Sequence, residues 1–160
     1  MLLPDDQIAG WSLPVRQLYE YWRAIHPADG KLPGRQHFDP LDVPLLMPMV
    51  WMVDVVRNAG TIRFRYRLLG TRHVRAMTRD YTGWWMDEAH ANFTNHPYAA
   101  HYLQVSEGQA SWRRGRPGFH VHSDYFEMER VMLPLARDGS TVDMILAITA
   151  YFDRNGKQTA

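Results

Sequence analysis

The chain has 160 residues, of which 46% are hydrophobic and 12% are aromatic. This size and apolar content predict one packed domain and exclude a disordered chain, because a domain of this length buries about 70% of the surface of its unfolded chain. The lack of cysteine excludes disulfides, zinc–thiolate sites and a cysteine nucleophile, and the formal net charge of +1 argues against a nucleic-acid-binding protein.

The first six residues contain neither a basic region nor an apolar run, so they do not have the pattern of a secretory signal. No stretch of the sequence reaches the roughly 18 apolar residues of a membrane span. We therefore expect a cytoplasmic protein without a membrane partner.

The first predicted helix begins at Ser12, which is expected to cap it, and ends before His26-Pro27, because a proline disfavours helix in the residue that precedes it. Apolar residues recur along this helix at helical spacing. They are Val15, Leu18, Tyr19, Trp22 and Ile25. This apolar stripe must be covered, either by the domain itself or by a second copy. We predict that it forms a docking surface or the interface of a homodimer.

The rest of the chain predicts short helices and five strands. A loop is expected at residues 31–36, and Asp39-Pro40 begins a short helix. Strands are predicted at residues 50–57, 61–69, 110–115, 125–135 and 142–152. Between the second and third strands, short helical segments precede a longer helix at about residues 95–107, for which Gly108 is a suitable C′ residue.

Two hairpins separated by helices exclude a doubly wound parallel fold, in which strands and helices alternate. The order of helices and strands along the chain predicts an α+β domain, with one five-stranded antiparallel sheet, short helices across one face and an extra N-terminal helix. The first and fifth strands are expected side by side at the centre. The predicted parts are an N-terminal helix and loop at 1–38, the main domain at 39–152 and a polar tail at 153–160.

The second strand is amphipathic, with Ile62, Phe64, Tyr66 and Leu68 on one face and Arg63, Arg65 and Arg67 on the other. We predict that these arginines pair with acids from another segment, such as the N-terminal 54 residues, which contain seven. The alternative is an anion-binding or nucleic-acid-binding surface. Nucleic acid is disfavoured, because the outward positions of this strand carry the arginines and no aromatic residue.

An ordered set of motifs resembles a family of small, stand-alone bacterial PAS-like proteins over residues 12–152. The motifs are Tyr21-Trp22, Pro33-Gly34-Arg35, Asp39–Val43, Phe64–Thr71, Thr82-Gly83, Glu129-Arg130, Pro134-Leu135 and Asp138-Gly139. The resemblance implies the PAS fold and a sensory or regulatory module that passes its signal to a separate signalling protein. It implies no shared ligand and no catalytic activity.

The resemblance also suggests an alternative, a haem-binding PAS sensor. In such domains an axial histidine comes from a helix in this region, so His96 and His101 are the candidates. Aromatic residues that could surround the macrocycle are Trp84, Trp85, Phe93, Tyr98 and Tyr102. The competing interpretation is that these aromatics form ordinary core and that His101 is exposed.

No motif in the sequence predicts catalysis or a metal centre. His120, His122 and Asp124 have ligand-like spacing on a strand, but Gly115, Pro117 and Gly118 before them favour a polar loop. The sequence has no P-loop, dinucleotide fingerprint or nucleophile elbow, so we predict that the protein is not an enzyme.

A pocket between sheet and helices is the remaining candidate for a site, because concave and mostly apolar surfaces bind small ligands. The expected lining residues are Phe64, Tyr66, Leu68, Trp84, Trp85, Tyr98, His101, Tyr102, Met128, Arg130 and Met144. Tyr66 and Arg130 are the expected polar contacts. The competing interpretation is that these side chains fill the space and leave no cavity.

Overall fold

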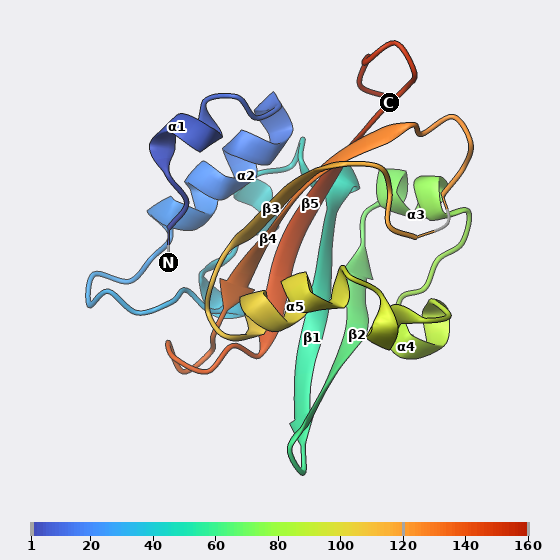
Figure 1. The fold of residues 1–160 in the computed structure, drawn as a ribbon. Coiled ribbons are helices and arrows are strands. Elements are labelled where there is room, and N and C mark those ends of the chain that lie inside the picture. The colour runs from blue at the N-terminus through green and yellow to red at the C-terminus, as the bar shows by residue number, and fades with distance from the viewer. Residues whose placement is uncertain (1, 120, 160) are drawn as a thin grey trace.

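In the computed structural model, residues 2–119 and 121–159 are described, and they form one five-stranded antiparallel sheet with the order β2-β1-β5-β4-β3 (Figure 1). The strands are β1 (Val50–Asn58), β2 (Thr61–Leu69), β3 (Ser111–Gly115), β4 (Glu127–Leu135) and β5 (Met144–Phe152). The predicted strands are confirmed to within two residues, and β1 pairs with β5 as predicted.

Helices cover both faces of this sheet. They are α1 (Asp5–Ile8), α2 (Leu13–Ala24), α3 (Thr71–Met77), α4 (Met86–Ala89) and α5 (Ala99–Ser106), with 3-10 turns η1 (Arg35–His37), η2 (Pro40–Asp42), η3 (Met47–Met49) and η4 (Phe93–Asn95). We call the face under α3, α4, η4 and α5 the inner face, and the face under α2 the outer face (Figure 1). No helix of the described residues is long and apolar enough to cross a bilayer.

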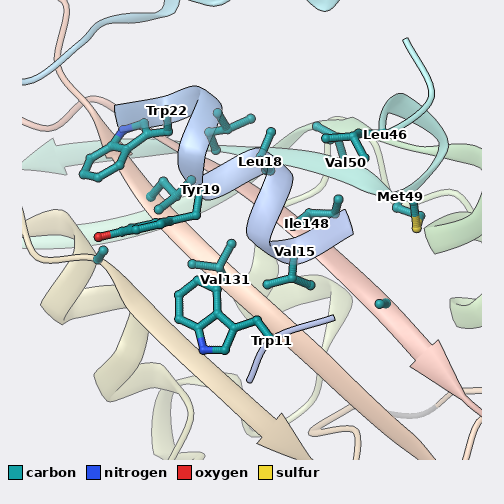
Figure 2. Packing of buried hydrophobic residues seen from close by; sticks show 14 of the residues in the cluster. Trp11, Val15, Leu18, Tyr19, Trp22, Leu46, Met49, Val50, Val131 and Ile148 are labelled. Atoms are coloured by element: carbon teal, nitrogen blue, oxygen red, sulfur yellow. The ribbon is translucent and has the colours of Figure 1, made fainter. Parts of the chain in front are cut away.

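Helix α2 packs on the outer face of the sheet of its own chain. Val15, Leu18, Tyr19 and Trp22 are buried there against residues such as Val131 and Ile148 (Figure 2). The Trp22 indole also donates to the Pro134 carbonyl of β4 at 3.0 Å. The structure therefore corrects the expected interface: of the two ways to cover the apolar stripe, the domain itself covers it.

Ile25, the fifth residue of that stripe, follows the last turn of α2 and is partly buried at the edge of the same cluster. It is therefore also committed to the core of its own chain. The stripe as a whole is not available to a partner while α2 lies on the sheet.

Helix α5 starts at Ala99, four residues later than predicted. Pro97 explains the difference, because it forces His96 into an extended conformation with ψ at 138°. The predicted end of the helix is confirmed, since Gly108 lies two residues beyond Ser106 with φ at +93°. Glycine adopts this left-handed conformation without the steric penalty of a side chain.

A β-bulge in β2 changes which face its last residues contact. Met52 pairs with Leu68, but Val53 pairs with Tyr66, so Arg67 is the extra residue on β2. Phe64 and Tyr66 face the inner core as predicted, whereas Leu68 packs against the outer core. The expectation that Leu68 faces inward is therefore wrong, because strict alternation ends at the bulge.

Candidate functional site

A cavity of about 40 Å³ lies between the inner face of the sheet and the segments that cover it. All five strands contribute to its lining, together with α3, α5 and the connection between β3 and β4. Most of the wall is aromatic or apolar, from residues that include Trp51, Tyr66, Met77, Tyr98, Tyr102, Phe119, Met128 and Tyr151. None of the described lining residues is Asp or Glu, so the cavity contains no carboxylate from the described chain.

Arg130 is the most unusual residue of this cavity. The side chain comes from the inner side of β4, and the residue is only 5% exposed. Its Nε and Nη2 atoms are buried and have no hydrogen-bond acceptor among the described residues. Its guanidinium carbon lies 5.6 Å from the centre of the Tyr102 ring. Burial lowers the pKa of Arg130, as expected for a charge removed from water.

Arg113 of β3 stands beside Arg130. The two residues are direct partners in the antiparallel register of β3 and β4, and both side chains line the cavity. The Arg113 guanidinium stacks on Tyr98 at 4.0 Å and donates to the Arg116 carbonyl, while its Nε has no acceptor among the described residues. Burial lowers the pKa of Arg113 as well. Two like charges therefore meet across strands in an apolar site.

Neutral polar groups complete the lining. The Tyr151 hydroxyl lies 3.1 Å from Nδ1 of His73, and the His73 ring stacks on Trp51 with ring centres 5.3 Å apart. Burial lowers the pKa of His73 to about 3, with nearby His90 and Arg130 adding to the effect. His73 is therefore neutral at pH 7 and does not add a third charge.

A second, larger depression of about 310 Å³ adjoins the cavity and shares Met77, Gly118 and Phe119 with it. His90 lines this depression, stacks on Phe119 at 4.1 Å and lies 2.7 Å from the Tyr66 hydroxyl through Nε2. Phe119 therefore contacts both the small cavity and the wider depression.

The cavity brings together five of the expected ligand contacts, which are Tyr66, Tyr98, Tyr102, Met128 and Arg130. Phe64 lies in the inner core but not in the cavity wall. Met144 packs on the outer core with Leu68. The expectation for Met144 is therefore wrong, because the inner residues of β5 are its odd-numbered neighbours, such as Ile145 and Ala147.

The two neighbouring tryptophans lie away from the cavity. Trp84 is 39% exposed, and Trp85 stacks under Arg63 and Arg65 at 4.2 and 5.3 Å. Both were expected to line the pocket, but residues 83–85 run along the edge of β2 instead, where Trp84 accepts a hydrogen bond from the Tyr66 backbone.

The inner cavity does not fit the haem alternative. His101 is outside the cavity wall, and its Nδ1 lies 3.0 Å from the Ser111 hydroxyl. His96 lines the outer depression and accepts a hydrogen bond from the Tyr98 backbone. Neither imidazole reaches the cavity, and 40 Å³ is far below the several hundred Å³ typical of sites for large ligands.

The histidine-rich motif after β3 does not form a metal centre among the described residues. His122 Nδ1 lies 3.2 Å from Asp124 Oδ2, and both side chains are exposed. His120 lies outside the described residues. Within residues 2–119 and 121–159, no group of three possible ligands could hold a metal ion.

Two of the three arginines in the row on β2 are paired with acids, as predicted. Arg63 binds Asp87 and Glu88 of α4, with the closest oxygen at 2.7 Å, and Arg65 binds Asp54 of β1 at 3.0 Å. Asp54 is the last of the seven acids in the N-terminal 54 residues. These two arginines are therefore already occupied, which weakens the alternative of an anion-binding or nucleic-acid-binding sheet.

A buried glutamate on the outer face is a feature that the sequence analysis missed. Glu129 is 0% exposed, and its carboxylate accepts hydrogen bonds from the Ser12 backbone at 3.0 Å and from the Trp112 indole at 3.0 Å. Ser12 is the N-cap of α2, but its hydroxyl makes no capping bond. Glu129 satisfies this helix end instead. Strand alternation gives the signal, since it puts Glu129 and Arg130 on opposite faces.

Comparison with known proteins supports one family. A family model described as a PAS domain matches residues 12–150, which is nearly the whole chain. No curated protein and no solved structure matches the chain.

Proposed function

Since this chain belongs to the PAS domain family, we propose that it is a sensory module in which the state of the inner cavity is transmitted across the sheet to α2 and regulates a separate protein. One observation carries the proposal. Adjacent residues of β4 serve the two faces: Arg130 lines the cavity, while Glu129 holds the N-terminus of α2. A shift of β4 caused by a ligand must therefore also act on α2.

A second strand gives the same connection. On β3, Arg113 lines the cavity, and its neighbour Trp112 stacks on Trp11 just before α2, with the ring planes 4° apart and the centres 5.5 Å apart. Trp112 also donates to Glu129. The cavity and the start of α2 are thus joined through two adjacent strands.

The surface beside α2 is suited to a protein partner. A groove of about 230 Å³ is lined by Gln17 of α2 and by residues 42–46. Tyr21 of α2 donates to Asp42 at 3.0 Å, so the helix and the groove move together. Leu41, just before this segment, and Leu45, within it, are 83% and 87% exposed, and exposed apolar patches mark interaction sites.

The test replaces Met128, which lines the cavity one residue before Glu129, with phenylalanine to fill part of the space. Hydrogen exchange of the backbone amides of residues 12–22 is then measured by mass spectrometry. We expect Met128→Phe to change these exchange rates at least threefold. Leu103→Phe is the matched control, because Leu103 is 44% exposed and lines a different groove.

Unchanged exchange in α2, with changed exchange near the cavity, would refute transmission to the helix. An equal change in the Leu103→Phe control would also refute it, because the response would then not depend on the cavity.

A further inference from the structure

The cavity contains two cationic side chains and no anion from the described chain. Arg130 and Arg113 face each other across β3 and β4. Like charges directly opposite each other in a sheet repel, and burial of an unpaired charge carries a large desolvation penalty. Elsewhere the same two strands avoid this situation, since Arg114 binds Glu127 at 2.7 Å.

The nearest glutamate cannot neutralise Arg130. Glu129 is its neighbour in the sequence, but alternation directs its carboxylate to the outer face, where Ser12 and Trp112 occupy it. The two unsatisfied nitrogens of Arg130 and the unsatisfied Nε of Arg113 therefore remain as donors without acceptors among the described residues. A ligand that supplies acceptors and negative charge would satisfy both requirements.

The size and walls of the cavity limit the ligand. A buried water needs about 10–15 Å³ of such volume, so 40 Å³ holds about three water-sized groups. Met77, Val121 and Met128 provide apolar wall that favours a short alkyl group over a fully hydrated ion. The planar fork of arginine matches a carboxylate, which accepts two parallel hydrogen bonds.

We propose that the inner cavity binds a short-chain monocarboxylate of the size of acetate, whose oxygens are held by Arg130 and Arg113. This inference rests on the proposed sensory function and names the class of ligand that the sensor would detect. The ligand completes a site that the empty protein leaves with uncompensated charge. A ligand with four heavy atoms binds no more tightly than a Kd of about 40 µM, so the site would respond to acetate only at concentrations of tens of micromolar or more.

The experiment titrates sodium acetate into the full chain by calorimetry, with sodium chloride and sodium phosphate as separate arms at equal ionic strength. We expect saturable binding of acetate and a melting temperature that rises with its concentration. Arg130→Met should weaken acetate binding at least tenfold. Arg114→Met, which removes the neighbouring arginine of the opposite face, should bind acetate within about twofold of the wild type.

The stability of Arg130→Met in the absence of acetate gives an independent readout. Removing a buried and unpaired charge in favour of an apolar side chain of similar length is neutral or stabilising. The melting temperature of Arg130→Met without ligand should therefore equal or exceed that of the wild type, whereas a purely structural arginine would lower it. Arg113→Met provides a second variant with the same expected loss of acetate binding.

Three results would overturn the proposal: equal binding of chloride or phosphate, unchanged acetate affinity in Arg130→Met, or no response to any of the three salts. None of them affects the exchange test of Met128→Phe. A failed acetate titration with a responsive α2 removes the ligand class and leaves the sensory proposal. Acetate binding with unchanged amide exchange in α2 would support the ligand class and refute transmission to α2.

Discussion

Burial shifts the pKa values of titratable residues in the inner cavity more than their contacts with partner residues do. His73 illustrates this, because its pKa falls to about 3 while it stacks on Trp51 and contacts Tyr151. Its neutral form is thus part of the folded structure. Arg130 cannot lose its proton in the same way, so the energetic cost of its burial persists at any physiological pH.

The loss of stability at acidic pH tests whether His73 is buried in its neutral form. Above its ordinary pKa of 6.5, the residue is neutral in both folded and unfolded states. Below pH 6.5 only the unfolded chain gains the proton, so stability should fall by up to about 1.4 kcal/mol per pH unit as the pH drops towards 3. His73→Phe should remove this contribution to the slope. Urea unfolding of both proteins between pH 7 and 4.5 measures it.

The comparison isolates His73, because His90, whose pKa burial lowers to about 4, is present in both proteins. At pH 7 the variant should be less stable by about 1–3 kcal/mol, since the buried Tyr151 hydroxyl loses its partner. Parallel stability curves for the two proteins would show that His73 is not the titrating group.

At the scale of elements, one buried carboxylate of β4 holds the N-terminus of α2, in addition to the apolar packing and the Trp22–Pro134 hydrogen bond. Glu129 accepts from a backbone N–H and an indole N–H, and no cation among the described residues pairs with it. Its negative charge lies at the N-terminus of α2, where the helix dipole favours it. The docking of α2 therefore depends on a residue of the same strand that lines the cavity on its other face.

Glu129→Gln should lower the free energy of unfolding by about 1–3 kcal/mol, because one carboxylate oxygen becomes an NH2 group, which donates and cannot accept from the N–H of Ser12 or Trp112 that faces it. Glu127→Gln is the control. Glu127 is partly exposed and pairs with Arg114, so its loss should cost less than about 1 kcal/mol. Equal effects of both substitutions in urea denaturation would contradict the assigned role of Glu129.

Strands β1, β4 and β5 could be predicted from the sequence because each is a long, mostly apolar run, and β2 could be predicted because its apolar and charged residues alternate. The faces were predicted correctly for β4 and for β2 up to Tyr66 but not for β5, because both faces of this sheet are covered and both carry apolar side chains. Met144 was therefore assigned to the wrong face. Likewise, the stripe on α2 shows that the helix must be covered, but it does not identify the sheet of the same chain as the cover.

At the scale of the whole molecule, the two faces of the sheet carry different structural features. The inner face holds the cavity and its two arginines, and the outer face carries α2 and the groove beside it. Arg130 was predicted as a site residue from its strand, but Arg113 was not, because only the pairing of β3 with β4 brings them together. Long-range register of this kind has no local signal in the sequence.

The exposed leucines beside the groove should mediate self-association. We expect the wild-type protein to be a homodimer in light scattering, and the double variant Leu41→Glu/Leu45→Glu to be a monomer with an unchanged circular dichroism spectrum. The fold should not change because both side chains are more than four-fifths exposed. The paired control Leu2→Glu, at another exposed position, should leave the dimer intact. A dimeric double variant would exclude this surface.

The bulge at Arg67 has a consequence for comparing this chain with its relatives. Because side chains alternate along a strand, a relative that lacks the extra residue would present its last β2 residues to the opposite faces. An alignment that places a one-residue gap elsewhere in β2 would then match inward residues with outward ones. Insertions and deletions at this position thus record a change in the architecture of both cores, not a neutral change in strand length.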